Sequence, residues 1–290
     1  MRGGLKKFMR DYSVVNPLGG DPYIKINLDS LDTLMQLSQK QGNLLFRMVH
    51  ARERGSIISN NIISISAATV EDFLRKIYPR ERLPREQLYD LVLRDIIISI
   101  TDTEYIINPR YISIAPASTS KVVLSSIDLP DYAKNAIGFD TINDSDFIKL
   151  YRDFPNWISD LRKAPRNVLL LISSMVSKSP VVRRGVPCID VEESRRYLME
   201  TCGLRKCDFE YALGGLLDLW YLFPVCGTYV SVNPYLIGFR TNAYVTRQRL
   251  LYNQIRSEEC EKDGSMSDSC DDSILTDQST SFRIKHPVLV

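Results

Sequence analysis

Histidine is nearly absent from this chain of 290 residues, which holds only His50 and His286. Its six cysteines form no CxxC pair, and Cys202 and Cys207 lack the further ligands that a zinc site needs. We therefore expect no metal. The spacing also lacks the density of a secreted disulfide scaffold, so we expect reduced thiols and a cytoplasmic location.

Long apolar runs are missing as well. No window approaches 18 uninterrupted apolar residues, and the basic start of the chain has no apolar stretch of signal-peptide length. These absences predict no membrane partner.

The motifs of common enzymes are also missing. The chain has no GxxxxGK[ST] loop, GxSxG elbow or HExxH helix, and two isolated histidines cannot form the paired-histidine site of a rolling-circle nuclease. The SxxK string from Ser118 to Lys121 lies without its supporting motifs. We expect neither catalysis nor a cofactor.

What is present is an ordinary globular composition with uneven charge. Hydrophobic residues make up 44% and charged residues 25%, enough to bury two modest cores. The net charge of +2 divides into +3 for residues 1–115, −3 for 116–160, +7 for 161–256 and −5 for 257–290. The third segment is the most suited to a polyanion, and the acidic tail is typical of a disordered segment.

The sequence contains two copies of one module. EYIINPRYI at 104–112 returns as TYVSVNPYLI at 228–237, an offset of 125 residues between the NP pairs. Tyr23-Ile24-Lys25 returns as Phe147-Ile148-Lys149, an offset of 124. Repetition of separated blocks at a near-constant offset indicates a duplicated unit of about 90 residues, the size of a small domain.

Each copy has the same predicted element order: helix, strand, helix, short turn, helix and β-hairpin. In the first copy we predict helices at 29–38, 41–52, 68–78 and 80–95, a strand at 60–66, and a hairpin of 96–100 with 104–108. In the second copy we predict that Asp190 caps the helix VEESRRYLMETC, that LRKCDFEYALGGLLDL is the next helix, and that Pro224 lies in an edge strand.

This order is typical of a winged helix, a helix-turn-helix followed by a two-stranded wing. The predicted fold is α+β and mainly helical, with two tandem winged-helix (helix-turn-helix) domains that carry short β-hairpin wings. The predicted domains are a flexible basic arm at 1–21, winged-helix domain 1 at 22–115, a connector at 116–145 with room for one short helix, winged-helix domain 2 with a basic C-terminal helix at 146–256, and an acidic disordered tail at 257–290.

Basic and amide side chains at the start of the third helix of a helix-turn-helix reach DNA phosphates and base edges. The candidate DNA-binding residues are Arg80, Arg82, Arg85, Gln87, Arg94, Arg183, Arg184, Arg195, Arg196, Arg205 and Lys206. The alternative is that these side chains are solvated or pair with acids such as Glu81, Glu86 and Glu192. Both wing tips lack Lys and Arg, so we expect the wings to stay out of a minor groove.

A structural role is expected for the two NP pairs, because Asn and Pro turn the chain away from a strand. For Gly214 and Gly215, which weaken the predicted helix, we expect a close helix contact.

The blocks Tyr23-Ile24-Lys25, the LxxLS of Leu34–Ser38 and the YxxNPxxI of Tyr105–Ile112 resemble the RepL-type replication proteins of plasmids and phages. The resemblance covers some 190 residues; the second copy departs from it where LxxLS becomes ISDLR. It implies a winged-helix protein that binds double-stranded DNA, most simply as a replication initiator. Transcriptional regulation and a non-enzymatic adaptor role through protein contacts remain alternatives, and the acidic tail is a candidate contact for host replication or transcription proteins.

Overall fold

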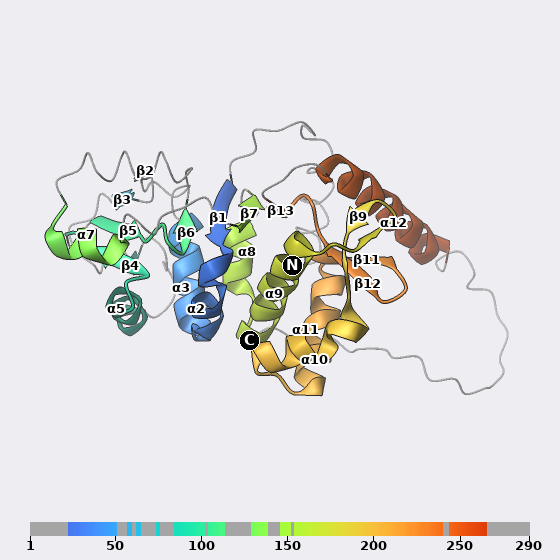
Figure 1. The fold of residues 1–290 in the computed structure, drawn as a ribbon, viewed down its shortest axis with the longest axis horizontal. Helices are drawn as coiled ribbons and strands as arrows, with labels where there is room; N and C mark the ends of the chain where they lie inside the picture. Colours follow the sequence, from blue (N-terminus) through green and yellow to red (C-terminus); the bar gives the residue numbers. More distant parts are fainter. Residues whose placement is uncertain are drawn as a thin grey trace. The chain divides into compact units, whose positions relative to one another are not determined.

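The computed structural model describes residues 23–50, 57–59, 62–64, 74–75, 84–101, 104–113, 129–138, 146–151, 154–239 and 244–265. Residues 1–252 form one compact unit and residues 253–290 a second. Within the described ranges the chain is mainly helical with several small antiparallel sheets (Figure 1). The predicted α+β class is confirmed at that level. The expected arm at 1–21 lies outside the described residues.

Described elements of the first copy are β1 (Tyr23–Asn27), the 3-10 helix η1 (Leu28–Ser30), α2 (Leu31–Gln36), α3 (Gln39–His50), β2 (Ile57–Ser59), β3 (Ile62–Ser64), α5 (Arg85–Leu93), β4 (Ile97–Ser99), β5 (Glu104–Ile107) and β6 (Ile112–Ser113). Those of the second copy are β7 (Phe147–Tyr151), α8 (Phe154–Asp160), α9 (Lys163–Lys178), β8 (Val182–Arg183), β9 (Val186–Pro187), β10 (Ile189–Asp190), α10 (Val191–Cys202), α11 (Lys206–Asp218), β11 (Leu222–Cys226), β12 (Tyr229–Val232) and β13 (Ile237–Phe239). Of the helix predicted at 68–78, only Leu74 and Arg75 are described, and both are helical.

A four-stranded sheet of order β13-β7-β1-β6 joins the two copies. Its central strands, β1 and β7, are the repeated segments, and they pair antiparallel with Lys25 opposite Lys149. These lysines hold the same position in each copy. The edge strands keep the relation, because β6 pairs with β1 as β13 pairs with β7. A local two-fold axis therefore passes between the two lysines.

The helices of the two copies pack across this axis. The first helix of each copy contacts the second helix of the other, so that α2 lies against α9 and α3 against α8 (Figure 1). One hydrophobic cluster contains Ile24, Leu44 and Leu91 of the first copy together with Leu150, Leu170 and Leu216 of the second. The main core is therefore shared by the two copies, because strand and helix pairing across the axis buries both apolar faces together.

A buried arginine, Arg166 of α9, lies at this axis where α9 meets α3. Arg166 is fully buried, and its Nη2 donates to the carbonyls of Leu37 at 3.1 Å and Ser38 at 3.4 Å. Its Nε and Nη1 have no hydrogen-bond partner among the described residues. Burial lowers the pKa of Arg166 to about 10, so the guanidinium stays protonated at neutral pH.

Beyond these helices, each copy builds a small sheet with one strand order. In the second copy β10, the strand that precedes α10 and α11, pairs with β12, and β12 pairs with β11. In the first copy β3 pairs with β5, which pairs with β4. Pro224 lies in the edge strand β11, at a register shift, as predicted.

Both NP asparagines stabilise a left-handed residue. Asn108 donates to the carbonyls of Asp95, at 2.8 Å, and Ala136, at 2.9 Å. Asn233, offset by 125 residues, donates to the carbonyl of Trp220 at 2.8 Å. Asp95 and Trp220 have φ values of 54° and 58°. The structural role predicted for the NP pairs is therefore confirmed, with a more specific bonding pattern than the sequence suggested.

The predicted connector does contain a short helix, α7 (Asp131–Ile137). Its buried residues Ala133 and Ile137 pack against Ile98 and Ile106 of the first hairpin. The C-terminal helix α12 (Val245–Ser265) runs past residue 257, where we expected disorder to begin. That boundary is wrong for residues 257–265, and the rest of the tail lies outside the described ranges.

Gly214 and Gly215 lie inside α11, but a Cβ at either position meets nothing within 4 Å. The close contact expected there is therefore absent. Replacing either glycine by alanine should raise the free energy of unfolding by about 1 kcal/mol, because alanine restricts the unfolded backbone and fits the helix. Urea denaturation of the two single variants checks this, and a loss of stability in either would contradict it.

Among the described residues, no helix has the length and apolarity needed to cross a membrane.

Candidate nucleic-acid interface

The first copy gives the weaker half of the predicted interface. Arg80 and Arg82 lie outside the described residues. Arg85 is exposed at the first position of α5, and the half-buried Gln87 follows it. Arg94 caps the other end of this helix, so the length of α5, about 14 Å, lies between it and the turn before α5. The structure thus separates Arg94 from the other first-copy candidates.

In the second copy a short turn, residues 203–205, joins the helices α10 and α11. Asp190 caps α10 as predicted, accepting from the backbone N–H groups of Glu192 at 3.0 Å and Glu193 at 3.3 Å. Gly203, with φ of 63°, ends α10 in the left-handed conformation that glycine adopts at little cost. Arg205 then precedes the first residue of α11. Arg205 and Lys206 are exposed at the N-terminal end of α11.

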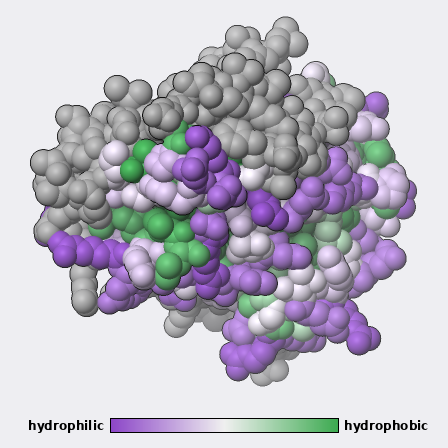
Figure 2. Space-filling view, turned by 60° about the vertical axis from the view of Figure 1, so that its left-hand side comes forward, coloured by the Kyte–Doolittle hydropathy of each residue, from purple (hydrophilic) through white to green (hydrophobic). Residues whose placement is uncertain are grey.

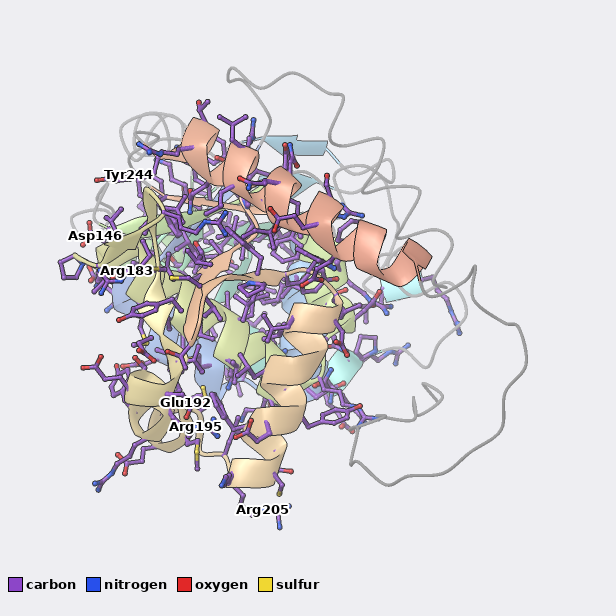
Figure 3. The ribbon with its side chains drawn as sticks, turned by 90° about the vertical axis from the view of Figure 1, so that its right-hand side faces the viewer. Asp146, Arg183, Glu192, Arg195, Arg205 and Tyr244 are labelled. Atoms are coloured by element: carbon purple, nitrogen blue, oxygen red, sulfur yellow. The ribbon has the colours of Figure 1, made fainter. Side chains whose placement is uncertain are left out.

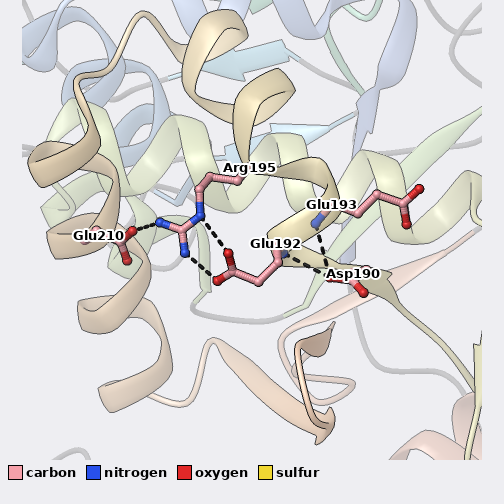
Figure 4. A network of polar contacts seen from close by, with 5 residues as sticks. All are labelled: Asp190, Glu192, Glu193, Arg195 and Glu210. Carbon is pink, nitrogen blue, oxygen red and sulfur yellow. Dashed lines mark hydrogen bonds and ion pairs between the residues drawn. The ribbon is translucent and has the colours of Figure 1, made fainter.

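Three of the candidate arginines are paired with carboxylates. Arg195 bonds Glu192 and Glu210 in the network drawn in Figure 4. Arg196 donates to Glu200 at 2.8 Å, and Arg205 donates to Asp208 at 2.9 Å. Hydrogen bonds to these acids hold the pKa of Arg196 and of Arg205 above its usual range. The alternative that these cations pair with acids is therefore correct for these three arginines.

These ion pairs differ in how firmly they hold the cation. The side chains of Arg196 and Arg205 are 89% and 82% exposed, and exposed pairs contribute little and exchange with other anions. Arg195 is 24% exposed and lies between two carboxylates, so it supports the α10–α11 packing. Lys206 has no ion-pair partner among the described residues.

A surface depression of about 530 Å³ lies beside this turn. Its walls come from the end of α10 and the start of α11, with Arg196, Leu204 and Lys206 among them. The residues that line it include no histidine, cysteine or serine. Among the described residues, no three His, Cys, Asp or Glu side chains group as metal ligands would. The depression suits contact with an anion better than nucleophilic chemistry.

Arg183 and Arg184 lie away from the α10–α11 turn, on the β8–β9 hairpin. Figure 3 shows Arg183 on the same side as Tyr244, which precedes α12, whereas Arg205 lies at the opposite end of the view. Both arginines are exposed, and both contact the β11–β12 wing. The structure therefore divides the predicted second-copy residues into two surfaces.

Charge distinguishes the two surfaces. Residues 189–210, which include α10 and the start of α11, hold four basic and six acidic side chains. Residues 178–187, 221–232 and 244–252, which include the hairpin, the wing and the first part of α12, hold five basic and no acidic side chains. The candidates predicted from the sequence include four cations of the first surface, and Arg183 and Arg184 but not Arg247 of the second. The sequence feature that points to Arg247 is an arginine-rich helix start in a part of the chain whose neighbouring segments hold no acidic residue.

The first copy carries an apolar surface where the second is polar. Tyr89 and Leu93 of α5 are each 64% exposed, and the corresponding residues of α11, offset by 125, are Gly214 and Asp218. Figure 2 shows apolar residues exposed in several places on one face of the molecule, among hydrophilic ones. The two copies therefore present different chemistry on their third helices.

Comparison with family models, curated proteins and solved structures finds no match to this chain.

Proposed function

We propose that this chain is a non-enzymatic protein that binds double-stranded DNA through two winged-helix units, in a bacterial cytoplasm. The observation that carries the proposal is the element order of the second copy, in which α9 is followed by β10, by α10 and α11, and then by β11 and β12, with β12 between β10 and β11 in the sheet. This is the order of a winged helix, whose third helix enters the major groove. The first copy has the matching order of β3, β5 and β4.

Within this proposal, α11 is the recognition helix of the second copy. Its N-terminal end is exposed, carries Lys206 without an ion pair among the described residues, and has Arg205 in an exchangeable surface pair. An N-terminal helix end also presents unpaired N–H groups to phosphates. The resemblance to RepL-type proteins makes replication initiation the role we favour, and transcriptional regulation uses the same contacts.

Replacing Arg205 and Lys206 together by alanine should weaken duplex binding. Each lost phosphate contact lowers the dependence of log K on log salt by about 0.9, so the double variant should lose about 1 to 2 units of slope. Fluorescence anisotropy of a labelled random duplex over a salt series measures this. Lys134→Gln, which removes one exposed cation from α7, is the control and should keep the wild-type slope.

The competing function is an adaptor that uses the same units for protein contacts. Exposed Tyr89 and Leu93 on α5 favour it for the first copy, since exposed apolar side chains at adjacent helical positions are a common feature of protein-binding surfaces. Absence of any salt-dependent duplex binding by the full chain would favour the adaptor and end the DNA proposal.

A further inference from the structure

The β8–β9 hairpin is held against the wing of the second copy. Arg183 donates to the hydroxyl of Tyr229 at 3.4 Å and stacks over its ring at 4.9 Å. Arg184 donates to the carbonyl of Val225 at 3.3 Å. Both partners belong to the wing strands and both are uncharged. The hairpin thus supplies two cations to a wing that has no Lys or Arg of its own.

A third cation reaches the hairpin from α12. Arg184 and Gly185 form its two-residue turn, with φ values of 48° and 79°, a pattern typical of a type I′ turn. A Cβ on Gly185 would lie 2.2 Å from Nε of Arg247, so the arginine side chain lies directly over this glycine. Arg247 is exposed and has no ion-pair partner among the described residues. The glycine therefore serves both the turn and the close approach of Arg247.

Among the described residues, no ion pair joins any of these three cations to a carboxylate. The hydrogen bonds of Arg183 and Arg184 go to a hydroxyl and a carbonyl, which leave the positive charge uncompensated. The three segments that build this surface contain no acidic residue. Arg195, Arg196 and Arg205, by contrast, already bind carboxylates. An anion approaching the hairpin therefore meets three cations whose charge no carboxylate among the described residues compensates.

We propose that Arg183, Arg184 and Arg247 form a basic ridge that binds the phosphate backbone of duplex DNA, on a surface separate from the α10–α11 turn. The proposal rests on the proposed function and adds the surface that supplies its phosphate contacts. In the first copy, Ile58 and Ser59 stand 125 residues before Arg183 and Arg184, so these two positions carry no cation there. The second copy is thus the one that anchors the chain on DNA, with contacts that fix position rather than read sequence.

Two native cysteines report on the two surfaces without any mutation. Cys226 is exposed at the end of the wing strand β11, beside the ridge, and Cys207 is exposed in the first turn of α11. The full chain is alkylated with N-ethylmaleimide with and without a random duplex of about three helical turns, and each peptide is quantified by mass spectrometry. We expect the duplex to slow alkylation of Cys226 several-fold at low salt, and this protection to disappear at high salt.

The matching variant is Arg183→Gln/Arg184→Asn/Arg247→Gln, in which asparagine is chosen because it tolerates the left-handed conformation of residue 184. Loss of three phosphate contacts should lower the salt slope by about 2 to 3 units. Lys134→Gln again serves as the control.

The outcomes separate the two proposals. If the wild-type chain binds duplex but leaves Cys226 as reactive as before and the triple variant keeps its slope, the ridge is wrong and DNA binding by α11 stands. If the wild-type chain binds no duplex, the proposed function fails and the ridge fails with it. Protection of Cys226 is measured on the native chain, so that test holds even where the triple variant folds poorly.

Discussion

Replacing Gly42 by alanine should lower the free energy of unfolding by about 3 kcal/mol, because the new methyl group overpacks the buried contact between α3 and α9. A Cβ on Gly42 would lie 1.7 Å from Nη1 of Arg166. The guanidinium has no exit to solvent, since Arg166 is fully buried. It would have to leave the carbonyls of Leu37 and Ser38, and a charged group then loses its remaining hydrogen bonds inside the core.

A double-mutant cycle tests whether this contact is the cause. In an Arg166→Ala background the space over Gly42 is open, and alanine is the better helix residue by about 1 kcal/mol. The same Gly42→Ala change should therefore become neutral or stabilising there. Chemical denaturation of the four proteins gives the coupling energy, and an equal cost in both backgrounds would show that Arg166 is not what excludes the methyl group.

The pair also shows where the duplication loses its symmetry. Gly42 and Arg166 are offset by 124 residues, the offset that relates Lys25 to Lys149, so they hold the same position in the two copies. Two arginines facing each other across the axis would place two cations in one buried space, and two glycines would leave a cavity. Arg166 in one copy and Gly42 in the other fill this buried space without a second cation and without a cavity.

Local patterns predicted most elements of the fold. Repetition, caps and hydrophobic spacing gave the helices and hairpins within a few residues, including the Asp190 cap and the edge position of Pro224. These features depend on neighbouring residues in the chain, which a sequence displays directly.

Contacts between the two copies could not be predicted from local sequence patterns. The pairing of β1 with β7 and the shared core join residues more than 100 positions apart, and the strand pattern of YIKIN shows only that it pairs with something. The same limit applies to the candidate interface. The partners Glu200 and Asp208 lie four and three residues from their arginines and are visible in the sequence, but the pairing of Arg195 with Glu210 of the next helix becomes apparent only in the structure.

Replacing Asn233 by alanine should cost about 3 to 4 kcal/mol, because several buried groups lose a partner together. Asn233 is fully buried, and its Nδ2 donates to the Trp220 carbonyl at 2.8 Å and the Tyr252 hydroxyl at 3.1 Å. Its Oδ1 accepts from the backbone N–H of Tyr235 at 3.0 Å. Thermal and urea unfolding of the full chain measure the loss.

Asn233→Asp separates the donated bonds from the accepted one. The carboxylate keeps the acceptor for the N–H of Tyr235 but places negative charge beside the carbonyl of Trp220 in a buried site. Burial raises the pKa of such a carboxyl in the folded state, so the stability lost at neutral pH should be partly recovered as pH falls through that raised value. A deficit that does not change with pH would contradict this account.

Asn108 offers the same test in the first copy. Asn108→Ala removes the two donated bonds to Asp95 and Ala136, one of which ties α7 to the hairpin, so we expect a similar loss of stability. A large cost at Asn233 with none at Asn108 would mean that Tyr252, which has no counterpart in the bonds of the first copy, carries the effect. Equal costs would show that holding the left-handed residue before each hairpin is the common requirement, and would explain on physical grounds why both copies keep an asparagine at this position.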